Sequence, residues 1–141
     1  MSAGELLGPE SGQDCDVLVV DDEPIVREAC RRVLESEGLR VALAQDARSA
    51  LAHPAARTCR VLLCDLMLPD RPGIEIASTL KALRPGLQVV LTTGLITPEN
   101  LAGTADTAYR GLLLKPFDES ELLEAIRNAL EAHAAAHAGS R

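Results

Sequence analysis

Short hydrophobic runs alternate with amphipathic stretches along most of this chain. Five of the runs are too short to be helices, and most are rich in β-branched residues. They occupy residues 17–20, 41–43, 61–64, 89–91 and 112–114. Because the apolar residues follow one another without alternating with polar ones, each run is typical of a strand buried on both faces of a parallel sheet.

The stretches between these runs carry apolar residues at helical spacing, with start and stop signals at their ends. Thr97-Pro98 is a cap followed by proline at the first helical position. Asp118 and Glu121 have the spacing of a capping box. The predicted helices span residues 24–37, 46–56, 73–84, 98–108 and 118–130. Five strands alternating with five helices predict an α/β fold with a doubly wound parallel sheet.

The ends of the chain differ in composition from its centre. Residues 1–13 are rich in Gly, Ser, Pro and Glu and are interpreted as a disordered leader. Residues 14–132 form one predicted domain, which the length of 141 residues and the apolar content of 47% allow. Residues 133–141 are rich in Ala and His and are interpreted as a C-terminal tail, a frayed extension of the last helix.

Charge and composition exclude several classes of protein. The net charge of −7 argues against a nucleic-acid surface, and one Tyr, one Phe and no Trp argue against a base-stacking platform. The four cysteines have no C-x-x-C spacing and are expected to be free thiols in a reducing cytoplasm. Neither a signal peptide nor a membrane-length apolar run is visible, so no membrane partner is expected.

Polar residues follow the predicted strands at the points where the strands end. They are Asp21, Asp22 and Glu23 after the first strand, Asp65 after the third, Thr92 and Thr93 at the end of the fourth, and Lys115 after the fifth. Right-handed crossovers bring the carboxyl ends of parallel strands to one edge of the sheet, where ligands bind. Clustered carboxylates repel one another unless a cation intervenes, and Mg²⁺ suits a site of one or two carboxylates with phosphate.

Each of these residues also has an ordinary structural interpretation. An acidic residue after a strand often caps a helix or faces water, a lysine before proline is often solvated, and a threonine often ends a strand. Asp65 is less ordinary, because no helix cap is obviously required before the segment Leu66-Met67-Leu68-Pro69. The convergence of all of them at one sheet edge favours a functional site.

Four sequence motifs resemble the response-regulator receiver family. They read VLVVDDEP at 17–24, LLCDLMLPDRPG around Asp65, VVLTTG around Thr93 and LLLKPF around Lys115. The resemblance extends from about residue 15 to about residue 130, and the motifs fall in order at the ends of the predicted strands. It implies a flavodoxin-like five-stranded parallel sheet of order 2-1-3-4-5 with five helices.

The resemblance also implies a phosphorylation site that uses Mg²⁺. Asp65 matches the phospho-acceptor, and Asp22 matches the direct metal ligand. Asp21 matches an acidic neighbour that acts largely through water. The backbone carbonyl of Met67 matches the third protein ligand of the metal.

Further positions match the family's switch residues. Thr93 matches the switch hydroxyl, with Thr92 one residue out of phase, and Lys115 matches the lysine that contacts the phosphoryl group. Pro116 matches a residue whose preceding peptide bond is usually cis. Leu112 departs from the pattern, since the family usually has an aromatic residue there. Ring rotation coupled to threonine movement is therefore not expected in this chain.

The function that the resemblance implies is a receiver that takes a phosphoryl group from a sensor histidine kinase or phosphotransfer protein. It would not be an enzyme in the usual sense, although it would catalyse its own phosphorylation and dephosphorylation. The face formed by residues 98–108, 112–114 and 118–130 is a candidate homodimer surface, and the output partner is unknown.

Three other interpretations stay open. An aspartyl-phosphate phosphatase of the dehalogenase type needs a second Asp at position 67, which is Met. A flavodoxin-like flavin or phosphate binder needs a Ser-, Thr- or Gly-rich first loop, which here is acidic. The third is a receiver fold used only for protein docking, with switching impaired by Leu112.

Overall fold

The computed structural model describes residues 15–101, 104 and 107–139, so the predicted leader lies outside the described residues. A parallel five-stranded sheet forms the centre of the molecule, with strand order β2-β1-β3-β4-β5. This confirms the predicted α/β fold and strand order. The strands are β1 Val17–Val20, β2 Val41–Ala44, β3 Val61–Asp65, β4 Gln88–Thr93 and β5 Gly111–Leu114.

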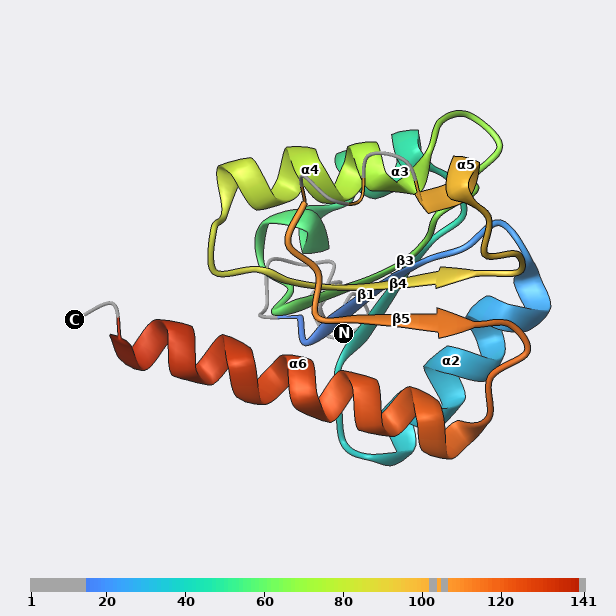
Figure 1. The fold of residues 1–141 in the computed structure, drawn as a ribbon. Coiled ribbons are helices and arrows are strands. Elements are labelled where there is room, and N and C mark those ends of the chain that lie inside the picture. Colours follow the sequence, from blue (N-terminus) through green and yellow to red (C-terminus); the bar gives the residue numbers. More distant parts are fainter. Residues whose placement is uncertain (1–14, 102–103, 105–106, 140–141) are drawn as a thin grey trace, which may run out of the picture.

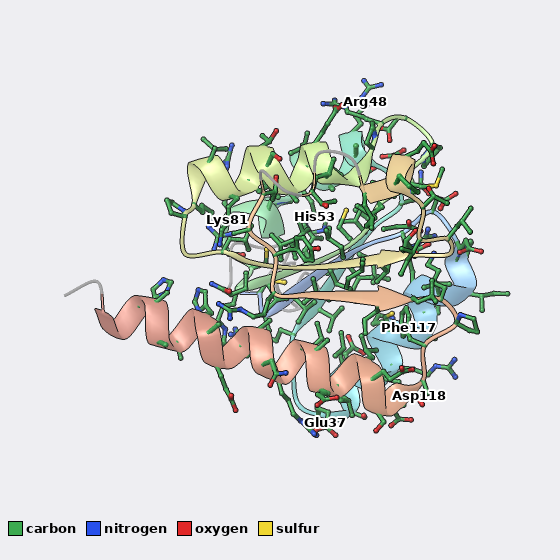
Figure 2. All side chains as sticks on the ribbon, in the orientation of Figure 1. Glu37, Arg48, His53, Lys81, Phe117 and Asp118 are labelled. Atoms are coloured by element: carbon green, nitrogen blue, oxygen red, sulfur yellow. The ribbon has the colours of Figure 1, made fainter. Side chains whose placement is uncertain are left out.

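Helices cover both faces of the sheet, as Figure 1 shows. On one face lie α2 (Pro24–Ser36) and α6 (Glu119–Gly139), and on the other lie α3 (Ala47–Ala52), α4 (Gly73–Leu83) and α5 (Pro98–Leu101). Side chains fill the space on each side of the sheet (Figure 2) and form two apolar clusters. Every residue of β1, β3 and β4 is buried, which explains the continuous apolar runs 17–20, 61–64 and 89–91 within these strands.

The helix ends follow local sequence signals. Asp118 and Glu121 form the predicted capping box, in which each backbone N–H donates to the other residue's carboxylate, at 2.9 and 2.8 Å. Gly38 follows α2 with a positive φ of 84°, a conformation that glycine adopts without strain. The last helix continues through the segment interpreted as a tail, as far as Gly139.

Two helices are shorter than predicted. The helix expected over 46–56 ends at Ala52, because Pro54 disfavours helical backbone at His53, which is extended (φ −74°, ψ 135°). A 3₁₀ turn, η2 Pro54–Arg57, follows. Of the helix expected over 98–108, the described residues form one turn, α5, and a 3₁₀ position at Thr104, while Thr107 and Ala108 are not helical. Residues 102–103 and 105–106 of that prediction lie outside the described residues.

All four cysteines are buried free thiols. Burial raises the pKa of Cys15 to about 12 and that of Cys30 to about 11. The thiols are therefore protonated at neutral pH and pack as small apolar groups. Among the described residues, no helix has the length and apolarity needed to cross a bilayer.

Candidate functional site

The predicted acidic residues meet at the carboxyl edge of the sheet. Asp21 and Asp22 follow β1, and Asp65 ends the adjacent strand β3, where Val20 pairs with Cys64 in the register of the two strands. One carboxylate oxygen from each of the three lies within 4.8 Å of the others. The predicted convergence of these three side chains is therefore present.

Asp21 and Asp65 are deeply buried, with 2% and 5% of their surface exposed, whereas Asp22 is exposed. The Oδ1 atom of Asp21 accepts from the N–H of Glu23 at 2.9 Å, and Oδ1 of Asp65 accepts from the N–H of Met67 at 2.9 Å. These backbone bonds fix the orientation of both carboxylates. Each of the two then presents its Oδ2 atom to the same ammonium group.

That ammonium belongs to Lys115, directly after β5. Its Nζ lies 2.8 Å from Asp21 Oδ2, 2.6 Å from Asp65 Oδ2 and 2.8 Å from Glu23 Oε1. Burial by itself lowers the pKa of Lys115, but its hydrogen bonds to the three carboxylates outweigh burial and raise that pKa. The Glu23 contact was not predicted, because nothing in the sequence distinguishes a carboxylate that pairs with the lysine from one that faces water.

Asp21 experiences opposing effects. Burial raises the pKa of Asp21, and the hydrogen bonds from Lys115 and from the Glu23 N–H offset that rise only in part. The nearby Asp65 adds repulsion in the same direction as burial. The site thus concentrates more negative charge than its one lysine neutralises.

The donor set suits a hard divalent cation. Asp21, Asp22 and Asp65 offer carboxylate oxygens within reach of one another, and oxygen is the ligand type that Mg²⁺ prefers. A cation there would relieve the repulsion that acts on Asp21. The assignment of the Met67 carbonyl as a further ligand stays a prediction.

The predicted switch residue, Thr93, is fully buried at the end of β4. Its hydroxyl donates to the carbonyl of Leu95 at 3.0 Å and accepts from the N–H of Leu95 at 3.2 Å. The hydroxyl is therefore engaged within its own loop. Leu112 packs partly buried against one apolar cluster, and the peptide bond between Lys115 and Pro116 is cis, as the sequence resemblance implied.

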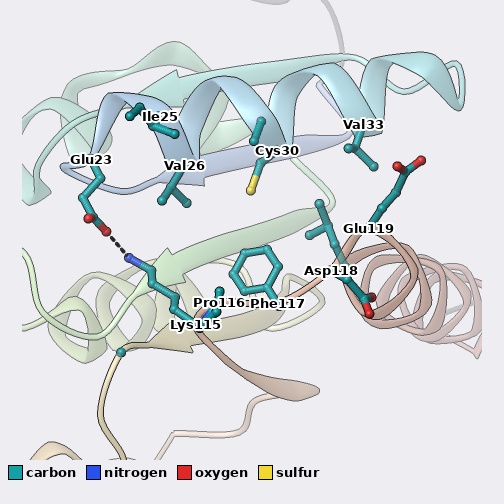
Figure 3. A pocket seen from close by; sticks show the side chains of 13 residues that line it. Glu23, Ile25, Val26, Cys30, Val33, Lys115, Pro116, Phe117, Asp118 and Glu119 are labelled. Carbon is teal, nitrogen blue, oxygen red and sulfur yellow. Dashed lines mark hydrogen bonds and ion pairs between the residues drawn. The ribbon is translucent and has the colours of Figure 1, made fainter.

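An apolar groove of about 530 Å³ opens beside this site (Figure 3). It runs between α2 and the segment from Lys115 to the start of α6, with Glu23 and Lys115 at one end. Val26, Cys30 and Phe117 line it. The α2 residue Ile25 lies at its margin with 85% of its surface exposed.

Replacement of Lys115 by methionine is expected to destabilise the fold by about 3 kcal/mol at pH 7, since two buried carboxylates lose their cation. The pKa of Asp21 would rise further. A carboxyl group whose pKa is raised by folding keeps its proton better when folded, so the variant should lose stability as pH rises above about 4. Urea unfolding at pH 5 and pH 7 measures this loss.

Lys81→Met is the matched control, because Lys81 is a half-buried lysine that donates to the carbonyl of Leu87 and pairs with no carboxylate among the described residues. It should not add this pH dependence. Equal pH dependence in Lys115→Met and the wild type would contradict the electrostatic description of the site.

Comparison with protein families matches residues 17–127 to the response regulator receiver domain. The response regulator MprA of Mycolicibacterium vanbaalenii is 38% identical over 115 residues, which are 81% of this chain and 49% of that protein. The probable transcriptional regulatory protein TcrX of Mycobacterium tuberculosis is 34% identical over 119 residues, 84% of this chain and 51% of that protein. The chain thus spans about half the length of these two relatives.

A solved structure agrees in fold. The crystal structure of a CheY-like response regulator receiver domain protein from Methanospirillum hungatei matches with a TM-score of 0.79 at 28% identity. The match covers 86% of this chain and 98% of that one.

Proposed function

Because this chain belongs to the response regulator receiver domain family, we propose that Asp65 accepts a phosphoryl group in two-component signalling. The donor is a phosphohistidine on a sensor histidine kinase or phosphotransfer protein, and the compartment is the cytoplasm. The observation that carries the proposal is the position of Asp65, a buried carboxylate fixed by the Met67 N–H and bonded to Lys115. It lies within reach of two further carboxylates that suit Mg²⁺.

Phosphorylation and dephosphorylation of Asp65 are two displacement reactions at phosphorus. A carboxylate oxygen of Asp65 forms a bond to phosphorus as the bond from phosphorus to the donor's imidazole nitrogen breaks, and the imidazole leaves. Later a water oxygen attacks phosphorus, the bond to Asp65 breaks and restores its carboxylate, and the protons of the water leave with inorganic phosphate. Both reactions depend mainly on positioning and on neutralising negative charge.

Lys115 and the proposed Mg²⁺ would share that neutralisation. Lys115, now shared among three carboxylates, would pair with a phosphoryl oxygen. Asp21, Asp22, Asp65 and the Met67 carbonyl would hold Mg²⁺, which would add positive charge next to the transferred group. Burial of Asp21 and Asp65 strengthens these interactions, because few waters screen them.

Phosphorylation would act on the rest of the molecule through Thr93. The added phosphoryl oxygens are strong acceptors, and the Thr93 hydroxyl would leave Leu95 to donate to one of them. That movement would pull the loop leading to α5 and alter the face of α5, β5 and α6, which is the proposed surface for an output partner or a homodimer. Leu112 makes loop movement, rather than ring rotation, the route.

Mass spectrometry after incubation with acetyl phosphate and Mg²⁺ tests this function. We expect one added phosphoryl group that hydroxylamine removes, as expected for an acyl phosphate, and that maps to Asp65. Modification on Ser or Thr would refute the proposal. Phosphorylation without any change at the α5–β5–α6 face would instead favour a docking scaffold with impaired switching.

Mg²⁺ should raise the melting temperature of the wild-type chain, since it binds the folded state selectively; at 100 times its Kd the gain is about 2.7 kcal/mol. Asp22→Ala should remove most of that gain, because Asp22 is the proposed direct ligand, while Lys115 bonds to Asp21 and Asp65. Thermal melts with a Mg²⁺ series measure both. Asp118→Ala, which removes a capping carboxylate from α6, should melt earlier yet keep the full response. An unchanged response in Asp22→Ala would place the metal elsewhere.

Ile25→Ser should slow phosphotransfer about tenfold when the donor is a histidine kinase that phosphorylates the wild type. The reason is that a docked donor would bury this side chain beside the groove. Phosphorylation by acetyl phosphate, which needs no protein contact, should be unaffected. Leu83→Ser on α4 is the control, since Leu83 is 73% exposed on the opposite layer. Equal loss with both donors would exclude docking as the cause.

A further inference from the structure

Asp70 lies in the loop after β3, the strand that ends in the proposed acceptor Asp65. It links this loop to helix α3, which comes earlier in the chain. Its Oδ1 accepts from the N–H of Ala47 at 2.9 Å, and its Oδ2 accepts from the N–H of Arg48 at 2.9 Å. The hydrogen bond from Ala47 lowers the pKa of Asp70, and that from Arg48 acts in the same direction. Both carboxylate oxygens are thus committed to a helix more than 20 residues away in sequence.

Helix α3 does not need Asp70 as its N-cap. Asp46 already holds that position, and its carboxylate accepts from the N–H of Ser49 at 2.7 Å. The next donor, the N–H of Ala50, pairs with the carbonyl of Asp46. Asp70 therefore takes the two N–H groups that remain in the first turn, which a helix cannot satisfy from within.

The other end of this link is the loop between Asp65 and α4. The loop closes on itself where the N–H of Gly73 donates to the carbonyl of Leu66 at 2.7 Å and where Met67 and Pro72 form an isolated bridge. Met67 and Asp70 lie within this closed segment. Asp70 is the residue in it that bonds to the α3 N–H groups, so it ties to α3 the same loop whose Met67 N–H bonds to Asp65.

We infer that Asp70 is a positioning residue for the acceptor site. By fixing the loop to α3, it holds the Met67 backbone in place, both the N–H that orients Asp65 and the carbonyl assigned to the metal. Asp70 touches neither the phosphoryl group nor the cation in this scheme. The inference rests on the proposed function, because it concerns how well the site binds Mg²⁺ and accepts the phosphoryl group.

The chain offers a matched pair of variants. Asp70→Ala and Asp46→Ala each remove a carboxylate that caps α3, but only Asp70→Ala releases the loop. Titration calorimetry with Mg²⁺ should give about tenfold weaker binding for Asp70→Ala, the size typical of residues that orient metal ligands. Asp46→Ala should be less stable and bind Mg²⁺ like the wild type. Asp70→Asn keeps an oxygen for one of the two bonds and should be intermediate.

Amide hydrogen exchange without metal gives a second measurement. The N–H groups of Met67 and Gly73 should exchange faster in Asp70→Ala than in Asp46→Ala. Equal Mg²⁺ affinities and equal exchange in the two alanine variants would overturn the inference and leave the proposed function intact. Absence of Mg²⁺ binding in the wild type would instead overturn both. If Asp70→Ala does not fold, Asp70→Asn carries the same comparison.

Discussion

Replacement of Asp65 by asparagine is expected to reduce phosphorylation by acetyl phosphate to background. The amide has nearly the shape of the carboxylate, so the hydrogen bond from the Met67 N–H to a side-chain oxygen can be kept. The amide lacks the anionic oxygen that attacks phosphorus. The variant loses the stabilising ion pair between Asp65 and Lys115. That loss of stability is offset in part, because the repulsion between Asp65 and Asp21 also disappears. The variant should therefore stay folded.

Intact-mass measurement and a thermal melt together separate loss of chemistry from loss of fold. Glu75→Gln is a suitable control, since Glu75 is an exposed carboxylate in the first turn of α4 and should leave phosphorylation unchanged. A hydroxylamine-labile phosphoryl group on Asp65→Asn would show that another residue is the acceptor.

Gly73→Ala is expected to be the most destabilising single-methyl change near the site, by about 3 kcal/mol or more. A Cβ atom at this position would lie 1.8 Å from the backbone carbonyl oxygen of Asp65 and 3.0 Å from the sulfur of Cys64. The obstacle is backbone in a buried strand, so relief requires moving the start of α4 or the acceptor strand itself. Phosphorylation of any folded fraction should fall as well, because Asp65 would shift.

Gly94→Ala is the matched comparison. Gly94 follows Thr93 at the same edge of the sheet, yet a Cβ atom there meets nothing within 4 Å. Denaturant unfolding of both variants should show a large loss for Gly73→Ala and a change within about 0.5 kcal/mol for Gly94→Ala. Similar stabilities would mean that the contact between α4 and β3 is looser than described.

The strands and the acceptor site could be predicted because their signals are local. Continuous apolar runs predicted the five strands, and the polar residues that end them predicted a site at the carboxyl edge. The order of the strands then places the side chains, since the neighbouring parallel strands β1 and β3 bring Asp21 and Asp65 together. The capping box at Asp118 was also a local signal, and it is present.

The predicted helices were too long where two local sequence signals oppose each other. Residues 46–56 have helical spacing throughout, but the restriction that Pro54 places on His53 prevailed. The helix expected over 98–108 does not reach Thr107 and Ala108, and threonine is a weaker helix former than alanine or leucine. Charged side chains also make contacts with residues far away in the sequence, Glu23 with Lys115 and Asp70 with α3. The hydrophobic periodicity of the sequence cannot predict such contacts.

The burial of every native cysteine makes this chain suited to site-specific labelling. The four thiols lie in the core, and burial keeps them protonated, so they should react slowly with maleimide reagents in the folded protein. A cysteine introduced at an exposed position such as Leu95 would then be the fast-reacting one. A fluorophore or spin label attached there would follow the loop next to Thr93 in real time, without first removing any native cysteine.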